Sequence, residues 1–211
     1  MAPRLWQRYP EMDVLIHNAG LELMHRTLTQ EGLEMVVAVN YFAPFLLTNL
    51  LIQEWSHMPL RKRRIIMTTS MVEKWGKIEF DNLQSEKLYG AEKTYYNSKL
   101  ALLLFTYELA SRHPGDFITA NCYEPGLVKT NFTRNFTGVA YVMSHIMTWF
   151  MRTPEVATST PIYLATSPEV ESITGKCFYN LKEKVTSQTS HDKELALTLW
   201  TETERIVRLT L

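Results

Sequence analysis

Tyr95 and Lys99 are the two side chains of this sequence whose types and spacing best suit acid–base chemistry. Residues four apart on a helix share one face, so these two groups would lie together. A phenol with its ordinary pKa of about 10 is a poor acid–base group at neutral pH, and a nearby ammonium favours the phenolate. The same spacing also arises where a core tyrosine precedes a lysine that reaches solvent. The pair therefore needs support from other polar groups.

Each predicted strand is followed by residues that could contact a ligand. The strands are expected at 13–17, 65–69 and 117–123. They are followed, in chain order, by Asn18, Ala19 and Gly20, by Ser70, and by Pro125, Gly126 and Thr130. A serine hydroxyl can hold a reacting oxygen, and small residues let a flat ligand approach the backbone. Each group alone would equally fit an ordinary turn or strand end.

The elements that must position these residues alternate between strand and helix along the chain. Helices are predicted from a cap at Thr29 through Trp55, with a kink or division at Pro44, and over 91–112, 154–167 and 191–207. A fourth short strand is predicted at 175–179. This alternation predicts a parallel sheet covered by helices, which binds ligands beyond the carboxyl ends of its strands.

Composition limits the kind of protein that this chain can form. Its 211 residues, 45% hydrophobic and 21% charged, predict a single globular domain over 1–211. The 22 basic residues balance the 22 acidic ones, so no nucleic-acid partner is expected. The six histidines and two cysteines lack metal-ligand spacing, so no metal site is expected, and Cys122 and Cys177 are expected to be buried thiols.

The chain shows neither a secretory signal nor an apolar run of the roughly 20 residues that a membrane-spanning helix needs. The longest apolar candidates are Phe45–Ile52 and Val139–Met151. We therefore expect a cytoplasmic protein, with peripheral contact to an intracellular membrane as one option for the second segment.

The positions of the eight glycines exclude the familiar phosphate-binding loops. The closest pair, Gly115 and Gly126, is eleven residues apart, so neither G-x-G-x-x-G nor G-x-x-x-x-G-K occurs. Any nucleotide-binding function must manage without a glycine-rich phosphate loop in these residues.

The order and spacing of the candidate groups, taken together, resemble the short-chain dehydrogenase/reductase superfamily. The matching residues are Asn18-Ala19-Gly20, Asn40, Ser70, Tyr95-x-x-x-Lys99, and Pro125-Gly126 with Thr130, and the resemblance covers about 13–207. Within that superfamily the chain is most similar to the retinol dehydrogenase group. The features are the long interval from Ser70 to Tyr95, which contains Ile78–Leu83, the run Tyr96–Ala101, and the late Leu199-Trp200.

The resemblance implies a Rossmann-like parallel sheet with helices on both faces and an NAD(P)-dependent oxidoreductase that interconverts an alcohol and a carbonyl. It implies that Tyr95 is the general acid or base and that Lys99 lowers its pKa and binds the nicotinamide ribose. Ser70 would bind the substrate oxygen, and Asn40 would hold a water of the proton relay. Cofactor contacts are implied for Asn18, Ala19 and Gly20 on the adenosine side, and for Pro125, Gly126 and Thr130 at the nicotinamide end.

Members of this superfamily begin with a strand, a T-G-x-x-x-G-x-G loop and a helix that holds the pyrophosphate. This chain starts just before what would be the fourth strand, so we expect an N-terminally truncated domain in which the first three strands are absent. The strand at Val14–Ile16 would then be an exposed edge. NAD or NADP would bind weakly or not at all, and the residue that separates the two cofactors cannot be identified.

The segment Val139–Met151 falls where the superfamily places its substrate lid. Its aromatic and methionine content suits a small lipophilic alcohol or carbonyl, such as a retinoid or steroid, but also a membrane surface or a buried helix. Two other functions therefore remain open. One is an inactive truncated relative that binds a partner or a second copy through the exposed strand or the long helix. The other is lipid binding through Val139–Met151.

Overall fold

A computed structural model of the chain describes residues 7–58, 61–113, 117–126, 128 and 153–208. Its strands form one five-stranded sheet in the order β1-β2-β3-β4-β5. They are β1 (Val14–His17), β2 (Arg63–Thr68), β3 (Ile118–Tyr123), β4 (Cys177–Tyr179) and β5 (Lys182–Lys184). The first four run parallel, as the alternation of strands and helices predicts.

The strand β5 was not predicted, and it runs antiparallel to β4. The two strands are joined by Asn180 and Leu181, which have positive φ angles of 51° and 63°. Two such residues form the tight turn that matches the twist of a hairpin. The segment Lys182–Lys184 carries only charged residues, so it lacks the apolar alternation by which a strand is recognised in a sequence.

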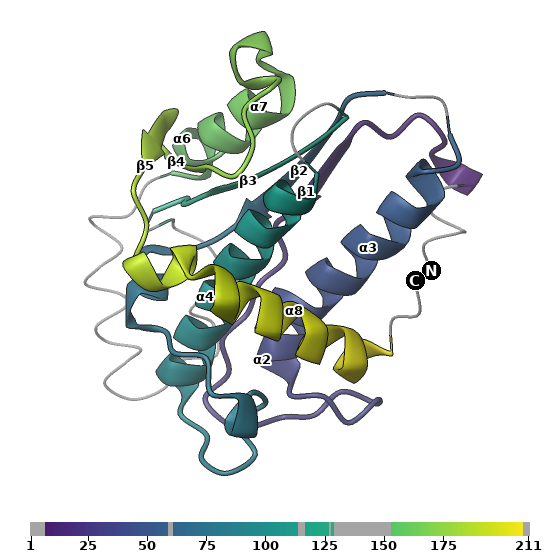
Figure 1. Cartoon of the computed structure of the whole chain (residues 1–211). Coiled ribbons are helices and arrows are strands. Elements are labelled where there is room, and N and C mark those ends of the chain that lie inside the picture. The colour runs from purple at the N-terminus through teal and green to yellow at the C-terminus, as the bar shows by residue number, and fades with distance from the viewer. Residues whose placement is uncertain (1–6, 59–60, 114–116, 127, 129–152, 209–211) are drawn as a thin grey trace.

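The helices cover both faces of the sheet, as expected for an α/β fold. They are α2 (Met35–Val37), α3 (Ala43–Trp55), α4 (Ala91–Arg112), α6 (Pro154–Ala157), α7 (Ser159–Thr166) and α8 (Lys193–Val207). Short 3-10 segments occur at Met71–Trp75, Phe80–Asn82, Pro168–Val170 and Gln188–His191. In Figure 1, α3, α4 and α8 lie on one face of the sheet, and α6 and α7 lie on the other.

Strand β2 shows why both faces are covered. Ile65 and Met67 point into the larger apolar core with α3, α4 and α8, whereas Ile66 points into a second core with Tyr123 and Leu164. Because successive side chains of a strand point to opposite faces, a run of apolar residues needs packing on both sides. The continuous apolar run of this strand therefore accounts for its central position.

The larger core is organised around aromatic side chains from three helices. The ring centroids of Phe45 and Phe105 are 5.0 Å apart, and those of Phe45 and Trp200 are 4.9 Å apart. The Tyr41 hydroxyl shares a hydrogen bond of 2.7 Å with Thr203 of α8, which satisfies a buried polar group. These contacts fix α4 against α3 and α8. The predicted bounds of α4, 91–112, are confirmed.

The first helical stretch begins later than predicted. Thr29 does not cap a helix from Gln30, because its hydroxyl accepts a hydrogen bond from the Leu33 amide within a turn. The helix begins at Met35, and the Glu34 carboxylate caps it by accepting from the Val37 amide at 2.8 Å. Threonine is a more common N-cap than glutamate, so the sequence pattern indicated Thr29 and not Glu34 as the cap.

The division expected near Pro44 takes the form of a π-helical segment, Ala38–Phe42, between α2 and α3. The amide of Ala43 bonds back to the carbonyl of Ala38, and Pro44 occupies the first turn of α3. Proline lacks the amide that would bond to Asn40, which disfavours a regular α-helix at this point.

The helical stretch Met35–Trp55 is long and apolar enough to cross a membrane by length and composition, although no sufficient run was expected from the sequence. Most of it is buried within the fold. Packing against α4 and α8 therefore accounts for its apolar character.

The strand β1 forms one edge of the sheet. It pairs with β2, and none of the other described residues pairs with its opposite edge. Ile16 is 41% exposed there, whereas Leu15 packs against the larger core. At the other side of the sheet, Cys122 and Cys177 are register partners in β3 and β4, and both are buried.

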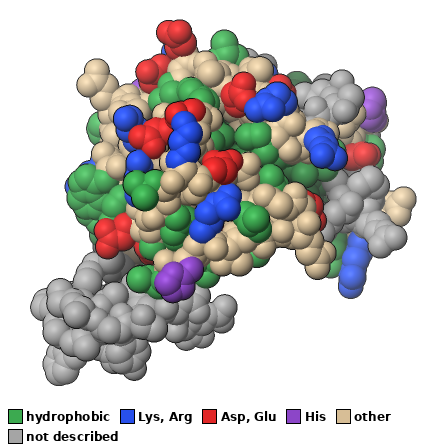
Figure 2. All heavy atoms as spheres, turned by 90° about the horizontal axis from the view of Figure 1, so that it is seen from below, with side chains coloured by type: hydrophobic (Ala, Val, Ile, Leu, Met, Phe, Trp, Pro, Cys, Tyr) green, Lys and Arg blue, Asp and Glu red, His purple; other side chains and the backbone are tan. Residues whose placement is uncertain are grey.

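Charges of both signs are mixed over the surface. Figure 2 shows one face of the molecule, on which basic and acidic side chains lie close to one another among hydrophobic ones. This distribution agrees with a sequence whose formal net charge is zero.

Candidate active site

Ser70 and Tyr95 meet at the carboxyl end of β2. Ser70 follows that strand and precedes the 3-10 segment Met71–Trp75, and Tyr95 lies in the first turns of α4. The Ser70 side chain lies close enough to Tyr95 to lower the pKa of its phenol as a hydrogen-bonding neighbour. The structure thus brings together two of the predicted catalytic residues from distant parts of the sequence.

Gly76 allows the segment that carries Ser70 to lie directly against α4. A Cβ atom at Gly76 would lie 2.6 Å from the Tyr96 carbonyl oxygen and 2.8 Å from Leu100 Cβ. No real Cβ atom tolerates such contacts, so only glycine permits this approach. The close contact of Gly76 with Tyr96 and Leu100 therefore helps to hold the segment that carries Ser70 beside Tyr95.

Lys99 lies one turn after Tyr95 and is buried, with 4% of its surface exposed. Its Nζ donates a hydrogen bond of 2.9 Å to the carbonyl oxygen of Thr68 at the end of β2. The same atom lies 5.6 Å from the centroid of the Tyr95 ring. Burial lowers the pKa of Lys99 to about 8. The ammonium is thus within reach of the phenol but is anchored to the sheet.

Asn40 connects the loop after β1 with α4. The side chain is fully buried, and its Oδ1 and Nδ2 each form a hydrogen bond of 2.9 Å with the backbone of Leu21. Nδ2 also donates to Ser98 Oγ at 3.0 Å, and Ser98 Oγ donates to the carbonyl of Tyr95 at 2.7 Å. The Asn40 amide thus fixes the protein's own backbone, and its role in holding a water stays a prediction.

The small residues after β1 lie at the same place. A Cβ atom at Gly20 would lie 3.4 Å from Lys99 Nζ and 3.5 Å from Asn40 Oδ1. Asn18 Oδ1 accepts hydrogen bonds from the Thr68 hydroxyl at 3.2 Å and the Tyr123 hydroxyl at 3.0 Å. The carboxyl ends of β1, β2 and β3 are therefore joined beside the candidate catalytic residues.

Pro125 and Gly126 follow β3 at the same end of the sheet. Gly126 has a φ of 75°, in the region that favours glycine, so the chain turns there. The preceding Glu124 is buried and forms an ion pair of 2.5 Å with Lys184 of β5. Thr130 and the predicted lid Val139–Met151 lie outside the described residues.

The electrostatics differ from the expectation that Lys99 lowers the pKa of Tyr95. The pKa of Tyr95 is raised, mainly by burial and further by the charge of Glu22, while the hydrogen bond with Ser70 acts in the opposite direction. The Lys99 ammonium is buried and donates to the Thr68 carbonyl, and its effect on the pKa of Tyr95 stays a prediction.

Glu22, in the loop after β1, is a buried acidic residue that the sequence interpretation did not consider. It is 8% exposed, and burial together with the charge of Glu92 raises its pKa to about 7. Its position two residues after Gly20 was the only signal in the sequence that could have identified it.

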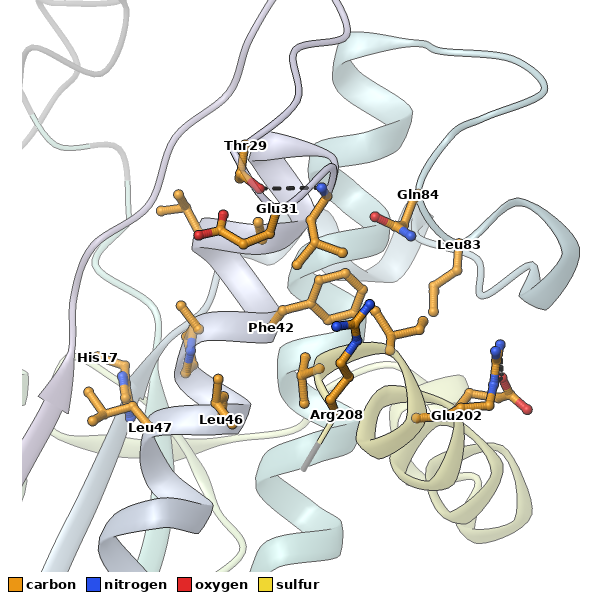
Figure 3. Close-up of a pocket in the computed structure, with 18 of the residues that line it drawn as sticks. His17, Thr29, Glu31, Phe42, Leu46, Leu47, Leu83, Gln84, Glu202 and Arg208 are labelled. Carbon is orange, nitrogen blue, oxygen red and sulfur yellow. Dashed lines mark hydrogen bonds and ion pairs between the residues drawn. The ribbon is translucent and has the colours of Figure 1, made fainter. Parts of the chain in front are cut away.

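A groove of about 1290 Å³ lies apart from these residues. Figure 3 shows that its wall is formed by Phe42, Leu46 and Leu47 on one side and by the end of α8 with Arg208 on the other. Of the predicted site residues, Ala19 lines it, and Ser70, Tyr95 and Lys99 do not. Within the described part of the chain, no group of three His, Cys, Asp or Glu residues could hold a metal ion.

Comparisons with known proteins identify relatives of this chain. The profile of the family described as short chain dehydrogenase matches residues 2–139. The chain is 40% identical over 207 residues to retinol dehydrogenase 14 of Homo sapiens, covering 96% of this chain and 61% of that protein. It is 33% identical over 194 residues to polyprenol dehydrogenase of Homo sapiens, covering 90% and 59%. The chain therefore spans about three fifths of the length of these relatives.

Solved structures share the fold. An uncharacterized protein from Mycobacterium paratuberculosis matches with a TM-score of 0.70 and 23% identity, over 99% of this chain and 72% of that one. A 4-hydroxyisoleucine dehydrogenase complexed with NADH matches with a TM-score of 0.61 and 24% identity, over 83% and 71%.

Proposed function

Because the chain belongs to the short chain dehydrogenase family, we propose that it is an oxidoreductase that interconverts an alcohol and a carbonyl with a nicotinamide cofactor. One observation carries this proposal: Ser70 lies beside Tyr95 at the carboxyl end of β2, and the buried ammonium of Lys99 lies 5.6 Å from the centroid of the Tyr95 ring. Asn40 supports that arrangement through Leu21 and Ser98. A hydroxyl pair beside a cation can hold a substrate oxygen and exchange a proton with it.

Each residue has a distinct role in the proposed reaction. Tyr95 donates its proton to the substrate oxygen during carbonyl reduction and accepts a proton during alcohol oxidation. Ser70 holds the same oxygen through its hydroxyl, and Lys99 stabilises negative charge that develops there. A nicotinamide cofactor, when bound, supplies or accepts the hydride.

The residues present fit the nicotinamide-ribose half of such a cofactor. Gly20 leaves open the space beside Lys99 Nζ and Asn40 Oδ1, which a side chain would begin to fill. Pro125 and Gly126 border the site from β3, and the Lys99 ammonium would bind ribose hydroxyls. The 211 residues contain no glycine-rich phosphate loop, so other groups would have to hold the pyrophosphate. We propose weak binding of NAD or NADP to these 211 residues alone.

We propose a lipophilic alcohol, or the carbonyl compound derived from it, as the substrate. The support is the identity of 40% and 33% to proteins named for retinol and polyprenol. For the same reason, we propose a cytoplasmic location with peripheral contact to an intracellular membrane, where such substrates dissolve.

The test combines cofactor titration with a pair of tyrosine variants. NADH and NADPH are titrated by fluorescence, and turnover is measured with retinol or retinal. Tyr95→Phe should lower kcat by at least about 100-fold and leave the cofactor Kd nearly unchanged, because it removes only the exchangeable proton. Tyr96→Phe is the matched control, because Tyr96 is the next residue of α4 and its ring packs on Trp75. Turnover by Tyr95→Phe at the rate of the control would refute the assignment.

A second candidate function is supported by the exposed edge of β1. Strand β1 pairs with β2 on one side only among the described residues, and with Ile16 exposed its other edge can add a strand from another chain. The protein would then bind a partner or form a homodimer without catalysis. Absence of cofactor binding at millimolar concentrations, together with concentration-dependent association that Ile16→Lys abolishes, would favour this function over the enzyme.

A further inference from the structure

The 3-10 segment Met71–Trp75, which begins directly after Ser70, is attached to the rest of the fold through a buried polar residue. Met71 and Trp75, at the two ends of the segment, are exposed. Glu73 is the one residue of the segment that is buried, with 3% of its surface exposed. Because the segment contributes no buried apolar side chain, its position depends on the contacts of the Glu73 carboxylate.

Both oxygens of that carboxylate are bonded to Ser187, which lies 114 residues later in the chain. Oε1 accepts a hydrogen bond of 3.0 Å from the Ser187 amide, and Oε2 accepts one of 2.5 Å from the Ser187 hydroxyl. A buried carboxylate without donors is costly, and hydrogen bonds to a charged acceptor are among the stronger ones. Burial of Glu73 therefore favours the one geometry in which both bonds form.

Ser187 is itself held in place, because the residues around it are bonded to α4. The preceding Thr186 shares a hydrogen bond of 2.8 Å with the hydroxyl of Tyr107 on that helix. Thr186 also lies 3.0 Å from His191 Nε2, and the His191 ring stacks on Tyr107 with their centroids 4.7 Å apart. The partner of Glu73 is thus attached to the same helix that carries Tyr95.

The backbone of Glu73 connects this attachment with Ser70. The Glu73 amide donates a hydrogen bond of 3.1 Å to the Ser70 carbonyl, and the Gly76 amide donates one of 2.9 Å to the Glu73 carbonyl. Glu73 is therefore bonded to both ends of the segment, and a displacement of Glu73 would displace Ser70 as well.

On the basis of the proposed function, we propose that Glu73 is a positioning residue, whose bonds to Ser187 hold the Ser70 hydroxyl beside Tyr95. Ser70 remains the group that binds the substrate oxygen, and Glu73 acts only through it. A misplacement of a reacting group by about 1 Å can cost about 100-fold in rate. Loss of the bonds between Glu73 and Ser187 should therefore change the rate more than the binding of the substrate.

Four variants separate this role from a loss of stability. Glu73→Ala removes both bonds, and Ser187→Ala removes only the hydroxyl donor. Glu73→Gln can keep both, because its amide oxygen can accept from the Ser187 amide and its nitrogen can donate to the Ser187 hydroxyl. Asp192→Ala is the matched control, because the Asp192 carboxylate accepts a hydrogen bond of 2.9 Å from the Leu195 amide within its own helix, α8.

The first test needs no turnover and uses NMR. The Ser187 amide should exchange its hydrogen at least about 10-fold faster in Glu73→Ala than in the wild type, because its acceptor is lost. The protein is also labelled with 13C at the tyrosine Cζ atoms, and the Tyr95 signal is assigned by its loss in Tyr95→Phe. This signal should move in Glu73→Ala in the same direction as in Ser70→Ala.

Both measurements should stay at their wild-type values in Glu73→Gln and Asp192→Ala, and Ser187→Ala should move the Tyr95 signal less than Glu73→Ala does. A Ser187 amide that stays protected in Glu73→Ala, or a Tyr95 signal that does not move there, would overturn the proposal whether or not the protein is active. If Glu73→Ala does not fold, Ser187→Ala decides, and an unmoved Tyr95 signal in that variant refutes the role of Glu73.

The second test uses carbonyl reduction with retinal. In Glu73→Ala, kcat should fall by about 10- to 100-fold, and KM should change less, because Ser70 acts mainly in the transition state. Glu73→Gln should restore most of the rate, and Asp192→Ala should keep the wild-type kcat. Equal losses of kcat in Glu73→Ala and Asp192→Ala would contradict a positioning role. If the wild type does not turn over while the NMR results are as expected, the proposed function fails and the attachment of the Ser70 segment through Glu73 stands.

Discussion

Gly76→Ala tests whether close packing of the Met71–Trp75 segment on α4 positions the candidate site. The added Cβ would lie 2.6 Å from the Tyr96 carbonyl oxygen, 2.8 Å from Leu100 Cβ and 3.0 Å from the Glu73 carbonyl oxygen. Two of these three atoms belong to the backbone, so a side-chain rotation cannot relieve the contacts. The segment and the helix must separate by several tenths of an ångström.

Overpacking of this kind typically costs about 1–3 kcal/mol. Replacing glycine also restricts the unfolded chain, which returns about 0.4–1 kcal/mol. We therefore expect a net loss of about 1–2 kcal/mol in the free energy of unfolding. With an m-value of about 2 kcal/mol/M, the midpoint of urea denaturation should fall by about 0.5–1 M. Ser70 should move away from Tyr95 as well, because Ser70 begins the displaced segment.

Gly20→Ala is the control for this measurement. Its Cβ would meet Lys99 Nζ at 3.4 Å and Asn40 Oδ1 at 3.5 Å, which are ordinary contacts. Its urea midpoint should stay close to that of the wild type, while its cofactor affinity should fall if the space beside Lys99 belongs to the cofactor. A midpoint for Gly76→Ala that is no lower than that of Gly20→Ala would refute the packing argument.

Two further predictions concern the core and the pH dependence of stability. Phe45→Ala should lower the free energy of unfolding by about 3–5 kcal/mol in urea titrations, because Phe45 is fully buried among Phe105 and Trp200. Burial lowers the pKa of His17 to about 4, so the unfolded state binds more protons between about pH 4 and 6.5, and stability falls as pH falls through that window. Glu22, whose pKa is raised, makes the free energy of unfolding change in the opposite direction between about pH 4.5 and 7. The contribution of His17, about 3 kcal/mol, is therefore measured as the difference in the free energy of unfolding between wild type and His17→Gln.

The sequence predicted the parallel strands and the long helix because each carries a strong local signal. The strand Arg63–Thr68 contains the apolar run Ile65–Met67, and Ala91–Arg112 ends at His113 before a proline and a glycine. The start of the first long helix was predicted at the wrong place. There the cap is a glutamate, and Thr29, the better cap by type, is used in a turn instead. Local preference was overridden by the contacts of the folded chain.

The membership of the site was more predictable than its electrostatics. The sequence predicts that Ser70, Tyr95 and Lys99 lie together, because Ser70 follows a strand and the other two are four residues apart on a helix. The protonation of these groups depends on burial and on charges brought in by other segments. Glu22 enters the site only because Asn40 holds the loop after β1 against α4, and no local pattern indicates that contact.

Burial of the candidate site also disfavours the charged forms of Lys99 and Tyr95. It lowers the pKa of Lys99 to about 8 and raises that of Tyr95, so the unionised phenol is favoured at neutral pH. Proton release from Tyr95 therefore depends on groups that stabilise the phenolate where it forms. The Ser70 hydrogen bond does so, and a charged Glu22 acts against it. Loss of the Ser70 hydroxyl in Ser70→Ala should then reduce kcat at every pH, and a kcat equal to that of the wild type would contradict this role.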